Sequence, residues 1–426
     1  MPPEQHEIER ADLNSAALQV LDGLAEAGYR ACLVGGAIRD LLLGYKPKDF
    51  DVSTNAEPEQ VAAVFGRRAR LIGRRFQIVH VRFGRELIEV STFRADPNAG
   101  TRDERRVDAS GRVLADNVFG SMAEDAGRRD FGINGLYYDI SDGCLYDYVN
   151  GMADARERRL RLVGDPTVRY REDPVRMLRV VRLSASHQLT VATNSKPPAE
   201  LIERLADVPP ARLFDEFLKL FMQPAAPAIH GELRRAGLFG VLFPQTEDVL
   251  AGPGGGASAA LIDKAVANTA GRIEAGKSVT PAFILAAILW PAVRETAATF
   301  ERDGMPAMPA LASAQAEVLA RQSARVSIPK RFSMPMRDIW HLQPRFHRRR
   351  GKQPARLLEH DRFRAAYDFL LLRAEVGEVD SELASWWTER QKQKGDDADA
   401  TANEDSDQQR RSGKRRNGRR GGRGRR

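Results

Sequence analysis

One short stretch, residues 33–54 (LVGGAIRDLLLGYKPKDFDVST), constrains the fold more than any other part of the chain. It begins inside a buried-looking run, CLV, and two glycines then interrupt the chain before an apolar segment at residues 37–43. Gly44 ends that segment, and the strand-like DFDVST follows. The order predicts a strand, a tight turn, a helix and a second strand in close succession.

The second strand carries two aspartates one residue apart, Asp49 and Asp51. Residues i and i+2 of a strand point to the same face, so we expect these carboxylates side by side, roughly 6–7 Å apart. Carboxylates that face one way repel each other unless a cation lies between them, and Mg²⁺ is commonly held by one or two carboxylates and substrate phosphates. The pair predicts a metal site for phosphoryl transfer. For the motif alone, a strand-end pair that caps a helix or faces water remains the alternative.

The two glycines, Gly35 and Gly36, predict a phosphate site between the first strand and the helix. Backbone N–H groups are available there, and no side chain obstructs an approaching phosphate. Arg39 lies in the first turn of the helix and is expected to reach a triphosphate, while Asp40 orients Arg39 or offsets its charge. A phosphate cradle beside a carboxylate metal site is what a nucleotidyl transferase needs.

The secondary-structure pattern changes near Gly151. Before it, strand-length and helix-length segments are mixed, which predicts a compact α+β domain with a long polar loop at residues 96–117. After it, residues 168–390 have helical periodicity with Pro and Gly breaks. We expect a catalytic head at 1–150, a helical neck at 151–225, a helical body at 226–392 and a disordered segment at 393–426.

Two segments of the helical part resemble other kinds of structure, a membrane-spanning helix and a P-loop. The apolar run Pro281–Val293 is bracketed by prolines and too short to span a bilayer, so a buried helix is expected. Residues 271–278 (GRIEAGKS) satisfy the P-loop pattern, but a P-loop follows a buried strand, and the preceding LIDKAVANTA is helical. We therefore predict a helix end followed by a turn.

Positive charge is concentrated at the C-terminal end. The net charge is +8, yet residues 410–426 alone hold ten Lys or Arg and no acid, so the rest of the chain is slightly negative. Such a segment has no apolar surface to bury, and Arg/Gly runs bind nucleic acid by neutralising phosphates. The acidic stretch 395–407 is expected to be a linker, and a tail that serves only solubility is the alternative. The candidate RNA-binding residues of the tail are Arg415, Arg416, Arg419 and Arg420.

A second basic run, RFHRRRGK at residues 345–352, combines positive charge with Phe346, a possible stacking ring. A solvated basic helix end is the alternative. The candidate RNA-binding residues of this run are Arg345, Arg348, Arg349, Arg350 and Lys352.

Sequence features also bear on the compartment. The N-terminal residues MPPEQHEIER contain no apolar run, so no signal peptide is expected. Cys32 and Cys144 supply neither a disulfide framework nor a Cys-x-x-Cys metal site. A cytoplasmic protein without a transmembrane segment is expected.

Three motifs together carry a resemblance to a known family. The stretch LVGGAIRDLLLG…KDFDVST resembles the first motif of the class II nucleotidyltransferases, which include the bacterial poly(A) polymerases and the tRNA CCA-adding enzymes. RRDFGIN (128–134) is similar to the family's RRDFTIN, with Gly132 in place of Thr, a change expected to remove one hydroxyl contact. REDPVRMLRVVR (171–182) is similar to the family's EDPLRMLRAVR helix. The resemblance covers the chain to about residue 390.

The resemblance implies a polymerase-beta-like nucleotidyltransferase head in which Asp49 and Asp51 hold catalytic Mg²⁺, with Mn²⁺ as the other possible ion. It also implies that Asp130 belongs to the catalytic residues. For the motif RRD alone, a local salt bridge is the alternative. The residues implied to contact nucleotide are Gly35, Gly36, Arg39, Arg129, Asp173, Arg176, Arg179 and Arg182.

Two of these positions have a more specific implied role. In the family, the helix that contains EDPVRM reads the incoming base, so Asp173 and Arg176 would select it by imitating a Watson–Crick edge. Glu89 is a further candidate, because polymerase-like sites often use a third carboxylate on an adjacent strand. A Glu89 paired with Arg74, Arg75 or Arg94 at the edge of the core is the alternative.

Three further segments resemble the poly(A) polymerase branch: residues 71–94, 209–221 and 334–352. This implies template-independent transfer of AMP from ATP to the 3′ ends of RNAs, such as mRNA and small RNAs, with RNA-decay proteins as possible partners. CCA addition to tRNA is the alternative activity. An idle RNA-binding scaffold and a sugar or antibiotic nucleotidyltransferase are less consistent with the two aspartates and the basic tail, respectively.

Overall fold

The computed structural model describes residues 1–73, 77–95, 105–107, 113–116 and 118–393. The chain forms two compact units that divide between Leu242 and Phe243. The boundaries expected at residues 150 and 225 both fall inside the first unit, and the finer division into head, neck and body stays a prediction. The acidic linker and the arginine-rich tail, with Arg415, Arg416, Arg419 and Arg420, lie outside the described residues.

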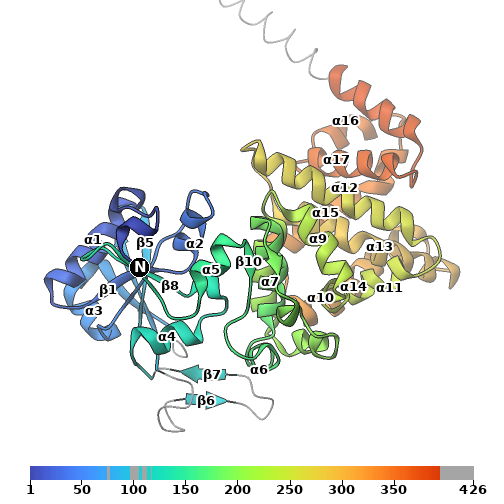
Figure 1. Cartoon of the computed structure of the whole chain (residues 1–426). Coiled ribbons are helices and arrows are strands. Elements are labelled where there is room, and N and C mark those ends of the chain that lie inside the picture. Colours follow the sequence, from blue (N-terminus) through green and yellow to red (C-terminus); the bar gives the residue numbers. More distant parts are fainter. Residues whose placement is uncertain (74–76, 96–104, 108–112, 117, 394–426) are drawn as a thin grey trace, which may run out of the picture. The chain divides into compact units, whose positions relative to one another are not determined.

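A seven-stranded mixed sheet organises the start of the first unit, in the order β3-β4-β5-β2-β1-β8-β9. Its strands β1, β5 and β8 are labelled in Figure 1. β2 runs parallel to β5, and the other neighbours are antiparallel. The bounds are β1 Ala31–Val34, β2 Asp51–Thr54, β3 Ala69–Ile72, β4 Ile78–Phe83, β5 Glu86–Thr92, β8 Leu136–Asp139 and β9 Cys144–Asp147.

The central strand β1 is buried on both faces of the sheet, and its alternating side chains enter two different core clusters. On β1, Leu33 belongs to the larger core cluster with Leu21 of α1 (Ser15–Glu26) and Val61 of α3 (Pro58–Phe65). Cys32 and Val34 point the other way, into a smaller cluster around Phe93, Met122 and Tyr137. This second face carries the candidate site.

The strand, tight turn, helix and second strand predicted around residues 33–54 are confirmed as β1, the Gly35 turn, α2 (Gly36–Leu42) and β2. Two short strands, β6 (Arg105–Val107) and β7 (Val113–Asp116), lie within the stretch predicted to be a loop throughout. The remaining α-helices and β-strands described in the first unit are α4 Met122–Arg128, α5 Gly151–Arg156, β10 Arg159–Leu160, α6 Pro166–Glu172, α7 Val175–His187, β11 Thr190–Val191, α8 Pro210–Phe221, α9 Ala226–Arg235 and α10 Leu238–Leu242.

The EDPVRMLRVVR segment was expected to be one helix, and this is wrong at its start. α6 ends at Glu172, and α7 begins at Val175. Asp173 lies between them in an extended conformation (φ −148°, ψ 95°). The cause is Pro174, which has no N–H to donate and disfavours helical geometry at the residue before it.

The second unit is helical. Its elements are α11 Pro244–Ala251, α12 Gly255–Glu274, α13 Pro281–Arg302, α14 Ala307–Arg325, α15 Lys330–Leu342, η7 Gln343–His347, α16 Gln353–Leu358 and α17 Phe363–Glu375, and residues 381–393 are also helical. The P-loop-like segment is the end of α12 and a turn, as predicted.

The predicted buried helix is confirmed in α13. This helix is long and apolar enough to cross a membrane by length and composition alone, but most of its apolar window is buried inside the protein. It continues past Val293, with Pro291 inside it. Burial of this kind is what a central helix of a helical body shows.

Candidate active site

The first feature of the site is a carboxylate pair across two parallel strands. Asp51 opens β2 and lies opposite Glu89 of β5 in the strand register. Asp51 is half-buried and Glu89 is exposed. The described ion pair of Glu89 is with His80 (3.4 Å), while Arg74 and Arg75 lie outside the described residues. The structure therefore brings Glu89 next to Asp51.

Asp49 is placed differently from the prediction. The strand begins at Asp51, so Asp49 lies in the preceding loop, where it is exposed, and the expected strand geometry for the pair is wrong. Asp49 nevertheless acts on Asp51. Burial, Glu89 and Asp49 together raise the pKa of Asp51 to about 6, against the opposing effect of Arg129 and Arg179. Glu89 and Asp49 thus disfavour the charged form of Asp51, an effect that a bound cation would relieve.

In the described part of the chain, no group of three metal-ligating side chains is already drawn together. Two carboxylates completed by substrate phosphates are nevertheless an ordinary Mg²⁺ arrangement. The donors are hard oxygens, and burial together with the nearby carboxylates of Glu89 and Asp49 raises the pKa of Asp51. The residues present therefore fit a divalent cation that arrives with a phosphate ligand.

Gly35 lies between this carboxylate and a basic residue. Its backbone (φ 74°, ψ −132°) is a conformation that other residues rarely adopt. A β-carbon there would lie 3.8 Å from Asp51 Oδ2 and 3.9 Å from Arg129 Nη1. Gly36 begins α2, and the guanidinium of Arg39 folds back to within 3.5 Å of the corresponding β-carbon position. The predicted phosphate-site residues are thus together.

Arg129 is fixed beneath the site by three side chains. Its Nη2 donates to Ser53 Oγ (2.8 Å) and Asp125 Oδ2 (3.0 Å), and its Nε donates to Tyr137 OH (3.3 Å). Tyr137 OH in turn donates to Asp125 (2.6 Å). This network leaves Arg129 little freedom to turn away from Gly35 and Asp51.

A chain of hydrogen bonds links α2 to α7 through the RRDFGIN segment. Arg39 Nη1 donates to Asn134 Oδ1 (3.2 Å), and Asn134 Nδ2 donates to Asp130 Oδ1 (3.1 Å). Arg179 Nε donates to Asp130 Oδ2 (2.7 Å). Asp40, as expected, binds Arg39 (2.6 Å) and so orients it. Asp130 is therefore engaged as an acceptor and holds Arg179 in place.

The electrostatics agree with that role for Asp130. Burial would raise its pKa, but Arg179, the hydrogen bond from Asn134 and the charge of Arg176 prevail and lower the pKa to about 2. The carboxylate remains charged near neutral pH. It is a poor proton acceptor there, because an effective general base has a pKa near the working pH.

Arg39, Arg179 and Arg182 concentrate positive charge beside this series of hydrogen bonds. Burial, followed by repulsion from Arg179 and a smaller contribution from Arg39, lowers the pKa of Arg182. Within the described residues, the buried Nε of Arg182 has no hydrogen-bond partner. An unpartnered buried guanidinium nitrogen is costly, and an anionic ligand would satisfy it.

Asp173 and Arg176, the two residues predicted to select the base, form hydrogen bonds with other residues of the same chain. Asp173 Oδ2 accepts from Arg212 (2.7 Å). Arg176 Nη1 donates to Arg169 O (2.6 Å) and to Glu172 Oε2 (3.2 Å). Both residues would have to exchange partners to read a base.

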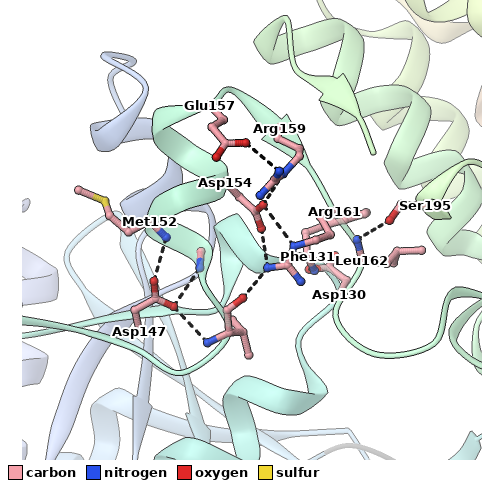
Figure 2. A network of polar contacts seen from close by, with 12 residues as sticks. Asp130, Phe131, Asp147, Met152, Asp154, Glu157, Arg159, Arg161, Leu162 and Ser195 are labelled. Carbon is pink, nitrogen blue, oxygen red and sulfur yellow. Dashed lines mark hydrogen bonds and ion pairs between the residues drawn. The ribbon is translucent and has the colours of Figure 1, made fainter. Parts of the chain in front are cut away.

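A buried network anchors the backbone of the RRDFGIN segment (Figure 2). Val163 N donates to Asp130 O (3.1 Å), and Gly132 N donates to Arg161 O (3.0 Å). Arg161 also forms an ion pair with Asp154 (2.7 Å), which is fully buried. The segment that presents Asp130 is thereby tied to the chain leading into α6.

This network explains Gly132. A β-carbon at this position would fall 2.1 Å from Asp154 Oδ2 and 2.7 Å from Arg161 Nη2. In this chain, the space that a larger side chain would need is held by the Asp154 carboxylate. The expected loss of a single hydroxyl contact describes only part of the change.

Several residues of the site were not singled out from the sequence. Asn134 ends the quoted RRDFGIN motif, which is a signal that could have found it. Ser53 lies two residues after Asp51 on the same strand face, and period-two alternation could have indicated it. His187, whose Nε2 lies 3.0 Å from Asp40 Oδ1, is 147 residues away in sequence and has no local signal.

The second basic run lies in the second unit. Arg345, Arg348, Arg349, Arg350 and Lys352 are all exposed, which a contact with RNA requires. The suggested stacking role of Phe346 is wrong, because its ring is fully buried against Trp387. The sequence places an aromatic residue among cations, but packing in the folded protein buries its ring in the core.

Comparison with known proteins agrees with this geometry. Models of three families match the chain: the poly A polymerase head domain at residues 31–161, the "probable RNA and SrmB- binding site of polymerase A" at 196–250 and the polymerase A arginine-rich C-terminus at 303–421. Poly(A) polymerase I of Salmonella typhi is 46% identical over 92% of this chain and 85% of that protein.

CCA-adding enzymes are more distantly similar to this chain. A CCA-adding enzyme of Lactobacillus johnsonii is 35% identical, but over only 50% of this chain and 51% of that protein. Among solved structures, an apo CCA-adding enzyme matches with a TM-score of 0.59 at 17% identity, covering 89% of this chain and 82% of its own, which shows a shared fold. The chain therefore belongs to the poly(A) polymerase family of RNA nucleotidyltransferases, whose reaction is template-independent polyadenylation of RNA.

Proposed function

We propose that the site around Asp51 transfers AMP from ATP to RNA 3′ ends, with Asp49 and Asp51 as the residues that hold a divalent cation. The observation that carries the proposal is the position of Asp51 in the field of two carboxylates, Glu89 and Asp49, and two guanidinium groups, Arg129 and Arg179. A cation and a triphosphate would together complete this charge pattern.

Mg²⁺ is the proposed ion, with Mn²⁺ as the alternative. When bound, a divalent cation supplies charge stabilisation for the attacking and leaving oxygens of phosphoryl transfer. Asp49 is exposed and Asp51 half-buried, so their carboxylates can accept a ligand that enters from solvent. Glu89 is proposed as a third carboxylate of the same site.

The triphosphate is assigned to the glycine turn and the arginine group. Gly35 and Gly36 have no side chains to obstruct a phosphate, and Arg129 lies beside Gly35 and Arg39 beside Gly36. Arg39 and Arg179 are fixed at the two ends of the hydrogen-bond chain through Asn134 and Asp130. Arg182 has the unpartnered nitrogen that an additional anionic oxygen would satisfy.

The proposed reaction is an in-line displacement. The RNA 3′-oxygen forms a bond to the α-phosphorus of ATP, the bond from that phosphorus to the bridging oxygen breaks, and pyrophosphate leaves. The hydroxyl proton passes to a carboxylate at the Asp51 edge. Asp130 contributes by holding Arg179, so its effect on the reaction is to position this cation. Asp173 and Arg176 are proposed to select adenine once their present partners are released.

RNA is assigned to two regions. Residues 196–250 match the segment whose model description names RNA and SrmB binding, and the exposed run from Arg345 to Lys352 supplies further positive charge. The tail residues Arg415, Arg416, Arg419 and Arg420 are proposed to add phosphate contacts. mRNA and small RNAs are the proposed acceptors, RNA-decay proteins the proposed partners, and the cytoplasm the proposed location.

The test is nucleotide incorporation by the purified protein with Mg²⁺, offering ATP or CTP separately. The acceptors are an RNA ending in oligo(A) and a tRNA that lacks its CCA end. We expect long ATP-dependent extension of the first acceptor with little use of CTP. Addition that stops at CCA on the tRNA alone would replace the proposal with the sister activity.

A further inference from the structure

A basic hollow of about 340 Å³ lies on the second unit, outside the region assigned to catalysis. It is formed by η7, by α16 and by Met308 near the start of α14. Three arginines line it: Arg345, Arg348 and Arg356. Its volume is in the range of small-ligand sites, roughly 300–1,000 Å³.

The positive charge of the hollow is not compensated. No acidic residue belongs to its lining, and among residues 1–393 as described, the side chains of Arg348 and Arg356 form no hydrogen bond or ion pair. The adjacent residue Arg349 does not line the hollow and is paired with Glu382 (3.1 Å). Three guanidinium groups without a carboxylate make this lining complementary to an anionic ligand.

Arg345 is oriented without being neutralised. Its Nη2 lies 3.0 Å from His341 Nε2. Burial, and then the charge of Arg345, lower the pKa of His341, so the imidazole is neutral at physiological pH and accepts a hydrogen bond from the guanidinium. The full positive charge of Arg345 therefore remains available to a ligand.

The backbone that presents Arg345 and Arg348 is anchored by Phe346, which directly follows Arg345. The ring of Phe346 is fully buried against Trp387, and its carbonyl accepts a hydrogen bond from Trp387 Nε1 (2.9 Å). A fixed backbone lowers the entropy that these arginines lose when they bind a ligand. The buried ring that cannot stack on RNA thus serves to position the neighbouring cations.

The remaining lining indicates the kind of anion. Guanidinium groups bind phosphate oxygens with two parallel hydrogen bonds. Gln353 offers a further polar group, and Met308, Pro344 and Leu357 form an apolar wall that suits a sugar or a base. A phosphate within a nucleotide fits both parts of the lining.

We propose that this hollow binds phosphate groups of the RNA acceptor, at a site separate from residues 196–250. The inference rests on the proposed function in taking RNA as the ligand. Phosphate could also come from a free nucleotide or from pyrophosphate, so the experiment has one arm for each source.

The first arm measures binding of a fluorescently labelled single-stranded RNA to the full chain over a range of KCl concentrations. The test variant is R345Q/R348Q/R356Q. The matched control, R302Q/R321Q/R364Q, removes the same charge from exposed arginines of the same unit that are paired with Glu295, Glu317 and Asp368. Because each phosphate contact contributes about 0.7 to the slope of log K against log salt, the test variant should lose about 2 from that slope and bind roughly tenfold more weakly. The control should keep a slope close to that of the wild type.

The second arm titrates inorganic pyrophosphate by calorimetry. A pyrophosphate binding event that is lost in the test variant while the RNA slope is unchanged would overturn the RNA proposal and assign the hollow to free phosphate instead. If the RNA slope changes as in the control and no pyrophosphate event is lost, the proposal is overturned.

Two further measurements keep the result interpretable. In the AMP-addition assay the control R302Q/R321Q/R364Q should keep the kcat and the KM for RNA of the wild type, whereas the test variant should show a raised KM for RNA. Absence of AMP addition in the wild type and the control would be a failure of the proposed catalytic function, while equal KM values in control and test variant would be a failure of the hollow. If the triple variant has a lower melting temperature than the wild type, the single variant R348Q is used in its place. The Arg348 side chain has no described partner, so its replacement breaks no described contact. The slope of R348Q should fall by about 0.7.

Discussion

Arg179 Nε donates a hydrogen bond of 2.7 Å to the carboxylate of Asp130, although the two residues are 49 positions apart in sequence. Asn134 extends this pair to Arg39. One carboxylate therefore fixes cations from α2 and α7 relative to each other. Predictions about catalysis begin with this pair.

Replacing Asp130 with Asn should lower polyadenylation strongly. The variant keeps the shape of the side chain but removes the charge that holds Arg179, and a misplaced catalytic group can cost about 100-fold in rate. The measurement is the steady-state rate of AMP addition with RNA and ATP at saturation. The control is D139N, which removes the charge from another Asp–Arg pair of the first unit, that with Arg30 (3.0 Å). Equal losses in both variants would contradict a specific role for the Asp130 pair.

The same carboxylate should make the stability of the first unit depend on pH. The pKa of Asp130 is lowered to about 2, below the ordinary value, so its ionised form stabilises the fold above that ordinary value. Two pKa units correspond to about 2–3 kcal/mol at neutral pH. The difference in unfolding free energy between wild type and D130N should stay constant from about pH 8 to pH 5 and shrink as the pH falls from about 4 towards 2. Urea unfolding at a series of pH values measures it, and a gap that persists undiminished in acid would refute the assignment.

Gly35→Ala should impair catalysis beyond its effect on stability. The positive φ of Gly35 costs other residues about 1–3 kcal/mol, and a shift of its backbone would move the turn against Asp51 and Arg129. Gly44 also has a positive φ (78°), with open space around it, so G44A is the matched control. Both variants should melt lower, but only G35A should lose most of its activity at a temperature where each is folded. Comparable activity in the two would show that the turn is merely structural.

Gly132 and Asp154 should be energetically coupled. Alanine at position 132 would place its β-carbon against the Asp154 carboxylate, a steric conflict expected to cost about 1–3 kcal/mol. In a D154A background that obstruction is gone, so the double variant should be more stable than the sum of the single losses predicts, by about 1 kcal/mol or more. A double-mutant cycle of unfolding free energies measures the difference. Additive losses would mean that Asp154 moves aside at little cost.

Glu89→Gln should reduce activity by about 10- to 100-fold if Glu89 shares the site of Asp51, a loss in the range of a positioned proton-transfer or charge-stabilising group. Glu86 provides the matched control, because it lies three residues away on the same strand and points to the other face. Activity at saturating Mg²⁺ compares E89Q with E86Q. A full-rate E89Q would show that Glu89 is an edge residue whose described partner is His80, with no part in catalysis.

Local sequence patterns determined much of the secondary structure of this protein. The strands and glycine turns of the head were predictable, since alternation and turn chemistry depend on residues that are adjacent in the chain. For the same reason the motif residues Gly35, Asp51 and Arg129 were recognised before their contact was known. The break at Pro174 was also encoded locally, although its effect on Asp173 was missed.

Only the tertiary structure decided which charges face one another. The sequence could not show that Asp130 binds Arg179, that Asn134 connects Arg39 to that pair, or that Asp154 occupies the space beside Gly132. It likewise presented Phe346 as a candidate for stacking, whereas the body buries the ring and leaves the flanking arginines around an uncompensated hollow. The physical reason is that burial and ionic pairing depend on packing between segments far apart in the chain, and this packing sets the desolvation and the partner of every charged group.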